Sequence, residues 1–163
     1  MELVLGIDPG TAITGYGVVA RQGGGAVSLV ECGVIRTSAG EPLATRIREI
    51  HEGTLELIER HRPVAVCVED VYHGKNAHTA LTLGHARGAI LLAASLRSVP
   101  ITEYTAVEIK KAVVGTGRAT KEQVGFMVQQ QLRLRHAPSP ADAADGVAAA
   151  LCHFIMTAFR PVA

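Results

Sequence analysis

Hydrophobic and polar positions in the first quarter of the chain follow the short period of β-strands. Residues 3–8 (LVLGID) form an apolar run that ends at a Pro-Gly pair, which is typical of a buried strand. Residues 14–21 and 26–37 flank a turn of three consecutive glycines at 23–25. These two segments therefore predict further strands in an antiparallel hairpin.

The pattern then changes to a helical period. Between residues 42 and 61, apolar side chains recur at Leu43, Ile47, Ile50, Leu55 and Ile58. A β-branched run at 64–69 predicts another strand, 76–97 predicts a long helix, and 100–104 predicts a short strand. Because a helical crossover precedes the strand at 64–69, we expect a mixed sheet with helices packed on it, which is an α/β fold.

Two capping boxes predict where the later helices begin. Thr105 is followed three residues later by Glu108, and Thr120 is followed by Gln123; this spacing is typical of a helix N-terminus. A last helix should begin at a Ser-Pro pair and run to about residue 159, since Ser is a good N-cap and Pro suits the first helical position.

Size and composition favour one globular domain over residues 1–163. Hydrophobic residues make up 48% of the 163 residues, and charges or glycines interrupt every apolar run before about 18 residues. We therefore expect a soluble intracellular protein without a membrane span or an apolar signal segment. The cysteines are too far apart for a disulfide framework or a zinc site; they are Cys32, Cys67 and Cys152.

The net charge of +1 hides a strong asymmetry. Residues 1–72 contain ten acidic and six basic residues, whereas residues 73–136 contain three acidic and nine basic residues. If the basic residues share a face, that face suits a polyanion. The alternative is a set of solvated helix surfaces.

Two acidic residues end the predicted buried strands. Asp8 ends the strand at 3–8, and Glu69 ends the strand at 64–69. If these strands are parallel neighbours, both carboxylates lie at the C-terminal edge of the sheet, where α/β proteins tend to place their sites. A strand end can also reach solvent, so either residue alone could be an ordinary surface acid.

Two further acids lie three residues apart near the start of the last helix. Asp142 and Asp145 share one helix face. Asp142 is the third residue after Ser139, so a capping role explains it. Asp145 lies a full turn further along, in the apolar sequence that continues as GVAAALCHFIM, and has no such explanation. We therefore expect the Asp145 carboxylate to face a functional partner.

Four converging carboxylates would repel one another unless a divalent cation lay among them. Hard oxygen ligands without cysteine or paired histidines favour Mg²⁺, with Mn²⁺ as a substitute. Two such ions about 4 Å apart can activate water and stabilise the leaving oxygen in phosphodiester cleavage. The basic middle of the chain matches a nucleic acid substrate.

Four segments together resemble the RuvC family of bacterial Holliday junction resolvases, over nearly the full length and in the same order. They read GIDPGTAITGYGVV, VEDVYHGKNAHTALTLGHARG, VVGTGRATKEQV and ADAADGVAAALCH. The resemblance implies a ribonuclease-H-like fold with a five-stranded mixed sheet flanked by helices. It also implies a homodimer that makes paired nicks in four-way junction DNA during recombination and repair, in the bacterial cytoplasm, with a RuvA and RuvB branch-migration complex as partner.

Carried over by position, the resemblance implies four metal-binding catalytic acids, at Asp8, Glu69, Asp142 and Asp145. Family members vary at the position of Asp142, where some carry histidine. Lys121 matches a basic position that assists catalysis or contacts DNA. The expected DNA contacts are Tyr72, Lys75, Asn76, Lys110, Lys111, Arg118 and Lys121. Tyr72 stands where relatives more often carry phenylalanine, and it can stack on a base at the junction centre.

Gly84 and Gly88 lie on one face of the helix predicted at 76–97. Small residues permit the close approach of another backbone, so this face could pack on the sheet or form the dimer contact.

Three alternatives remain at this stage. The GIDPGTAITG turn resembles the phosphate-binding turn of actin-like nucleotide-binding modules, although such proteins need two domains to close over a nucleotide. A non-catalytic junction-binding protein would use the acids only to cap and pack. A YqgF-like nuclease acting on RNA would share the fold and the acids.

Overall fold

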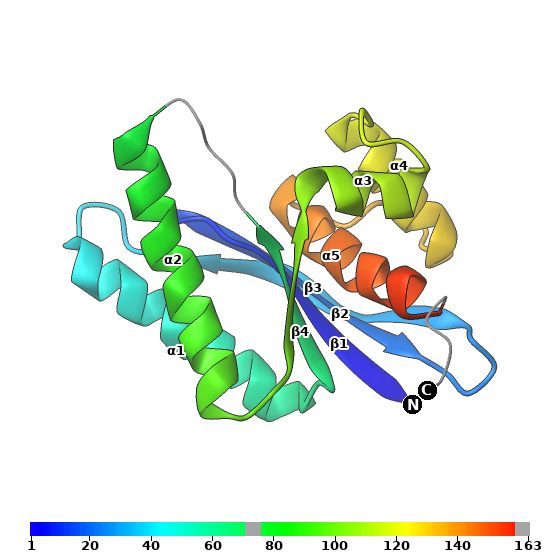
Figure 1. The fold of residues 1–163 in the computed structure, drawn as a ribbon, viewed down its shortest axis with the longest axis horizontal. Coiled ribbons are helices and arrows are strands. Elements are labelled where there is room, and N and C mark those ends of the chain that lie inside the picture. The colour runs from blue at the N-terminus through cyan, green and yellow to red at the C-terminus, as the bar shows by residue number, and fades with distance from the viewer. Residues whose placement is uncertain (71–75, 159–163) are drawn as a thin grey trace.

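The computed structural model describes residues 1–70 and 76–158, and its strands form one five-stranded mixed sheet (Figure 1). The spatial order of the strands is β3-β2-β1-β4-β5. Strands β1 to β3 pair antiparallel, while β4 pairs parallel with both β1 and β5. The predicted meander and mixed sheet are therefore confirmed. The strands are β1 (Glu2–Asp8), β2 (Ile13–Arg21), β3 (Val27–Arg36), β4 (Ala65–Asp70) and β5 (Ile101–Thr105).

Helices cover both faces of the sheet, as Figure 1 shows. One face packs against α1 (Leu43–His61) and α2 (Ala77–Leu96). The other packs against α3 (Ala106–Val114), α4 (Lys121–Gln131) and α5 (Ala141–Ala158). This three-layer arrangement buries the apolar side chains of both faces of the central strands, which explains why β1 and β4 read as continuous apolar runs.

The alternation of side chains along β1 and β4 divides the core into two clusters. Leu5, Ile7, Val66 and Val68 belong to the cluster under α1 and α2, whereas the residues between them face α5. Because the period of a strand is two residues, Asp8 and Glu69 both fall on the α5 face. The sheet therefore places these two acids on one side without any irregularity in either strand.

Both predicted capping boxes are present. The Thr105 hydroxyl accepts a hydrogen bond from the Glu108 amide at 3.2 Å, and Glu108 Oε2 accepts from the Thr105 amide at 2.8 Å. Thr120 and Gln123 make the same pair of bonds, at 3.2 and 2.8 Å. These bonds satisfy amides that the first helical turn leaves without partners, and they fix the starts of α3 and α4.

The start of the last helix differs from the prediction. Helix α5 begins at Ala141, the Ser139–Pro140 peptide bond is cis, and the Pro140 carbonyl accepts the Ala143 amide at 3.0 Å. Because Pro140 supplies this first acceptor, it takes the cap position that the sequence assigned to Ser139. Asp142 is thus the second residue of the helix and not the third residue after its cap.

Helix α2 has the length and composition of a membrane-spanning segment, contrary to the sequence-based expectation. It contains 20 residues with a mean hydropathy of 1.2 over its most apolar window, 28% of which is buried. Arg87 is the one Lys, Arg, Asp or Glu among these 20 residues, and a single charge does not lower the average enough. Ala86, Ile90 and Ala93 are buried in the core, so one face of this apolar helix packs inside the fold.

Helix α5 lies unusually close to β1 and β2 because glycines meet at the contact. A Cβ atom built at Gly15 would overlap the Asp142 carbonyl, and one at Gly6 would overlap the Gly146 carbonyl. On the helix side, a Cβ at Gly146 would lie 2.5 Å from the Tyr16 Cα atom. The backbones of helix and sheet are therefore in direct contact.

We expect Gly15→Ala to destabilise the protein by about 3 kcal/mol, because the added methyl group must push α5 away from β2. Gly125→Ala is the matched control: nothing lies within 4 Å of a Cβ at Gly125, on α4, and alanine favours a helix by about 1 kcal/mol over glycine. Urea unfolding measures both changes. Equal stability of the two variants would contradict the close contact.

Candidate metal centre

Asp8 and Glu69 end up side by side because β1 and β4 are parallel neighbours. Gly6 pairs with Cys67 and Ile7 with Val68, and one further step in this register brings Asp8 to Glu69. Both side chains line the same cleft. The two carboxylates therefore meet at the C-terminal edge of the sheet as expected, although Glu69 is the penultimate residue of β4 and not its last, because the strand continues to Asp70.

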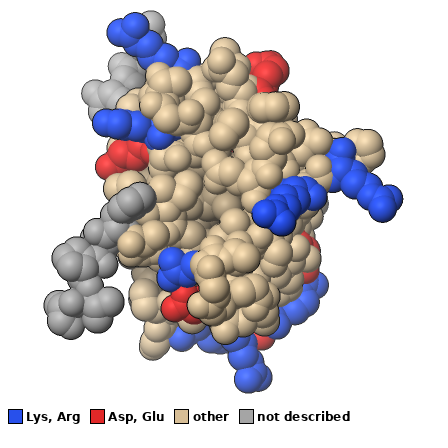
Figure 2. Space-filling model, turned by 90° about the vertical axis from the view of Figure 1, so that its right-hand side faces the viewer, with Lys and Arg blue, Asp and Glu red and all other residues tan. Residues whose placement is uncertain are grey.

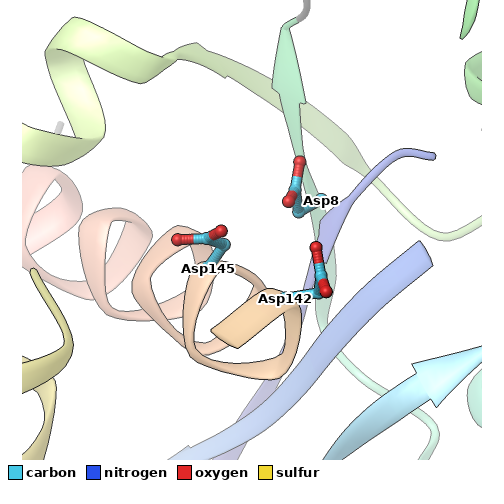
Figure 3. Close-up of side chains that lie close together, drawn as sticks. All are labelled: Asp8, Asp142 and Asp145. Atoms are coloured by element: carbon cyan, nitrogen blue, oxygen red, sulfur yellow. The ribbon is translucent and has the colours of Figure 1, made fainter. Parts of the chain in front are cut away.

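The first two turns of α5 bring two more carboxylates to this edge. Asp8, Asp142 and Asp145 each offer an oxygen atom, and these atoms all lie within 4.8 Å of one another. Figure 3 shows Asp8 on β1 close to Asp142 and Asp145, which both come from the start of α5. Glu69 is outside this group of three, among the residues that the structure describes, although it lines the same cleft.

Burial and the crowding of negative charge raise the pKa values of Asp8 and Glu69. Burial, together with the charges of Glu69 and Asp145, raises the pKa of Asp8 to about 8. Burial and the Asp145 carboxylate also raise the pKa of Glu69. Both shifts mean that the protein holds these carboxylates where their charged forms lack sufficient solvation or cationic partners.

Two lysines partly offset this charge. Lys121, the first residue of α4, donates a hydrogen bond from Nζ to Asp145 Oδ2 at 2.9 Å. This bond raises the pKa of Lys121, and the ammonium acts against the upward pKa shifts of Asp8 and Glu69. Lys110 on α3 lines the cleft and acts in the same direction on Glu69.

The Lys121–Asp145 contact was not visible in the sequence, where no basic residue lies near the acids. The residues are 24 positions apart. The capping box at Thr120 locates Lys121 in the first turn of α4, but nothing local indicates which element that turn faces. Leu83 of α2 and Ala148 of α5 also line the cleft, and no sequence signal distinguishes them from other apolar core residues.

The cleft has a volume of about 260 Å³, and its donor set suits a hard divalent cation. Asp8, Asp142 and Asp145 provide carboxylate oxygens only, which is the chemistry that Mg²⁺ and Mn²⁺ prefer over Zn²⁺. A cation among them would also relieve the repulsion that raises the pKa of Asp8. These residues therefore fit a divalent metal ion.

The expected DNA contacts occupy different environments. The Asn76 Oδ1 atom accepts a hydrogen bond from the Thr79 amide at 3.2 Å, so this side chain caps α2. Lys111 and Arg118 are exposed on α3 and on the connection to α4. Tyr72 and Lys75 lie outside the described residues.

Two basic residues of the middle segment are paired with acids of the protein. Arg87 of α2 and Arg97, just after that helix, form ion pairs with Glu103 and Glu59. On the side of the molecule that α4 and α5 cover, Figure 2 shows Lys and Arg side chains at several separate places, some of them beside Asp or Glu. Of the basic residues that the structure describes, Lys110 and Lys121 line the cleft, and the hypothesis of one basic face stays a prediction.

Comparisons with known proteins give a consistent result. The family model described as crossover junction endodeoxyribonuclease RuvC matches residues 4–153. A protein of that name from Pelotomaculum thermopropionicum is 49% identical over 151 residues, covering 93% of this chain and 92% of the relative. Its counterpart from Moorella thermoacetica is 50% identical over 159 residues, covering 97% and 94%.

Solved structures show the same likeness. Thermus thermophilus RuvC in complex with a Holliday junction substrate superimposes with a TM-score of 0.90 at 39% identity, covering 96% of this chain and 95% of that one. The yeast mitochondrial Holliday junction resolvase has a TM-score of 0.72 at 14% identity, with coverages of 96% and 81%. At that identity the yeast structure supports the fold alone.

The raised pKa of Asp8 predicts a pH-dependent stability. An acid with a pKa of about 8 in the folded protein and about 4 when unfolded binds more protons folded than unfolded, so stability falls as pH rises between these values. We expect Asp8→Asn, in the presence of a chelator, to remove part of this decline and to be more stable than the wild type at pH 8.

Urea unfolding at pH 5 and pH 8 measures the effect. Glu52→Gln is the control, because that acid is 65% exposed on α1; its stability should follow the wild type at both pH values. If Asp8→Asn were less stable than the wild type at pH 8, the ionised Asp8 carboxylate would stabilise the folded protein, contrary to this prediction.

Proposed function

Because the chain belongs to the RuvC family of crossover junction endodeoxyribonucleases, we propose that its acidic cleft is the active site in which it hydrolyses phosphodiester bonds of Holliday junctions. The observation that supports this most directly is the convergence of Asp8, Asp142 and Asp145 within 4.8 Å. Paired cleavage of such junctions resolves recombination intermediates, which places the protein in homologous recombination and DNA repair.

The acidic residues hold divalent cations in this proposal. Asp8, Asp142 and Asp145 supply the oxygens of the cluster, and Glu69 completes the site from the neighbouring strand. Two Mg²⁺ ions, or Mn²⁺ in their place, supply a lowered pKa for the attacking water and charge stabilisation of the leaving oxygen. The close contact of α5 with β1 and β2 keeps the carboxylates of helix and strand together.

The lysines act on the substrate phosphate. Lys121 reaches into the cleft from the capped start of α4, and Lys110 reaches it from α3. Their ammonium groups neutralise charge on the scissile phosphate and its neighbours, which favours both binding and the transition state. Lys111, Arg118, Lys75 and Asn76 extend this contact to the flanking backbone, and Tyr72 stacks on a base at the opened junction centre.

The alternatives account less well for the cleft. An actin-like module would need the turn after β1 to hold phosphate, whereas the carboxylates of Asp8 and Glu69 near the ends of β1 and β4 would repel it. A protein that only binds junctions has no use for three converging acids, one of which, Asp8, has a pKa raised by burial and by neighbouring carboxylates. A YqgF-like nuclease acting on RNA shares the acids, so substrate controls must separate it from a DNA resolvase.

An exposed apolar stripe on α2 supports a homodimer. Leu81, Leu92 and Leu96 are 66%, 53% and 58% exposed, and nothing lies within 4 Å of a Cβ atom at Gly84 or Gly88. These positions recur at helical spacing along one face, and all of them except Leu96 line an open apolar groove. The small-residue face is therefore not packed on the sheet, and a second copy could approach its backbone closely. A dimer also explains how two symmetric strands are cut.

The remaining expectations from the family stay predictions. We take residues 1–163 as one nuclease domain that works in the bacterial cytoplasm, where its DNA substrate lies. Coupling to a RuvA and RuvB branch-migration complex would deliver the junction to the dimer.

The metal-site assignment predicts that Asp145→Asn binds a synthetic four-way DNA junction but cuts it at least about 100-fold more slowly with Mg²⁺. Loss of one carboxylate ligand removes a few kcal/mol of transition-state stabilisation. Asp8→Asn and Glu69→Gln should behave in the same way. Single-turnover cleavage and junction binding without Mg²⁺ measure the two effects separately.

Glu122→Gln is the control for these variants, since Glu122 is an exposed acid beside Lys121 and should cut normally. Duplex DNA and a four-way RNA junction test the substrate. Full activity of Asp145→Asn would remove α5 from the metal site, and preferred cleavage of RNA would favour the YqgF-like alternative.

The dimer assignment predicts that Leu81→Glu raises the dimer dissociation constant about 30-fold or more, because burying a charge in an apolar interface costs at least about 2 kcal/mol. Analytical ultracentrifugation measures this change. On a cruciform plasmid, the variant should give nicked circles where the wild type gives linear product. Val30→Glu, at a position 48% exposed on β3, is the control. An unchanged dimer in Leu81→Glu would place the interface elsewhere.

A further inference from the structure

Arg87 joins two neighbouring strands on the side of the sheet that α2 covers. Its side chain comes from the middle of α2, and Nη2 donates a hydrogen bond to Glu103 Oε1 on β5. Its Nε atom lies 3.8 Å from Asp70 Oδ1, at the end of β4. One guanidinium group therefore contacts two carboxylates on adjacent parallel strands.

This bridge lies directly behind Glu69. Val68 and Glu103 are paired across β4 and β5, and Val68 packs in the cluster under α2. Asp70 follows two residues later and so shares that face, while Glu69 between them points to the α5 face. The carboxylate that lines the cleft is thus carried by a strand end that Arg87 holds from the back.

The geometry suits arginine in particular. The Arg87 Nε atom is buried and makes no hydrogen bond with any residue that the structure describes, and the Asp70 carboxylate lies 3.8 Å from it. A planar guanidinium can direct Nε and Nη2 at two carboxylates at once. A lysine has a single ammonium group on a flexible stem, so it cannot hold two carboxylates in this fixed geometry.

A direct contact with DNA is a weaker explanation for Arg87. Its charge is matched by two carboxylates, so the group of three carries a net charge of −1, and a phosphate would compete with both. Arg87 is also only 31% exposed. Its position instead suits a role in positioning the end of β4.

We propose that Arg87 is a positioning residue: by tying Asp70 and Glu103 to α2, it fixes the end of β4 and thereby the Glu69 carboxylate in the cleft. This inference rests on the proposed function of the cleft. A displaced Glu69 should slow the chemical step, while binding of the junction, which depends on cationic residues elsewhere, should change little.

Helix α2 also offers a matched control. Arg97, just after the helix, donates hydrogen bonds to Glu59 of α1, and the two side chains are 43% and 54% exposed. This pair likewise joins two elements through one guanidinium, but it lies before β5 begins, at the opposite edge of the sheet from the acids. Arg97→Ala should therefore lose an ion pair without moving Glu69.

The experiment compares Arg87→Ala, Arg87→Lys and Arg97→Ala with the wild type. We expect Arg87→Ala to lower the single-turnover cleavage rate by about 10- to 100-fold, the range for a reactive group displaced by up to about 1 Å. Its junction Kd, measured without divalent cation, should stay within about twofold. Arg87→Lys should recover only part of the rate, whereas Arg97→Ala should cut like the wild type.

Glu103→Gln provides a second route if Arg87→Ala folds poorly, since it weakens the same bridge without leaving a buried charge. It should also lower the cleavage rate. Because both substitutions weaken the same bridge, the double variant with Arg87→Lys should lose less activity than the two single losses combined predict. Cleavage by Arg87→Ala at the rate of Arg97→Ala would overturn the proposal. So would a rate loss matched by an equal loss of junction affinity, which would indicate a DNA contact. A wild type that does not cut junctions would overturn the proposed function itself, and this inference with it.

Discussion

The direct contact between the backbone of α5 and the backbones of β1 and β2 is the constraint on which the site depends. Gly6 and Gly15 on the strands and Gly146 on the helix leave no room for a Cβ atom at the interface. Any larger side chain there would lift α5 from the sheet and carry Asp142 and Asp145 away from Asp8. The same contact that completes one half of the core therefore also assembles the carboxylate cluster. A substitution that changes the packing of α5 on the sheet therefore also changes the distances between the carboxylates.

Electrostatic repulsion is the cost of that assembly. Burial and neighbouring carboxylates raise the pKa of Asp8 to about 8 and raise that of Glu69 as well, so the fold holds its acids in a less favourable state than water would. Lys121 and Lys110 relieve part of this strain, and a divalent cation would relieve more. Unfavourable electrostatics of this kind are common at sites that bind charged ligands. Carboxylates that already have enough cationic partners would gain little from binding a cation.

The two faces of the sheet have different roles in this proposal. On one face, α3, α4 and α5 bring lysines and carboxylates to the cleft. On the other, α2 contacts the end of β4 and the middle of β5 through Arg87, and it leaves Leu81, Leu92 and Leu96 exposed where we propose the dimer contact. A single helix thus lies between the proposed dimer contact and the strand that carries Glu69. A dimer formed through α2 would hold each cleft in a fixed relation to its partner.

The sequence alone determined the elements and the identity of the acids, because these follow from local rules. Strand period placed Asp8 and Glu69 at strand ends, helical period placed Asp142 and Asp145 on one face, and the Thr105 and Thr120 boxes located two helix starts. The start of α5 was misplaced because Pro140, and not Ser139, supplies the first acceptor. Which of the four acids lie within 4.8 Å, where Lys121 binds and what Arg87 joins depend on how close α5, α4 and α2 come to the sheet. Only the tertiary structure decides that, since those distances are set by side chains and glycines on elements far apart in the chain.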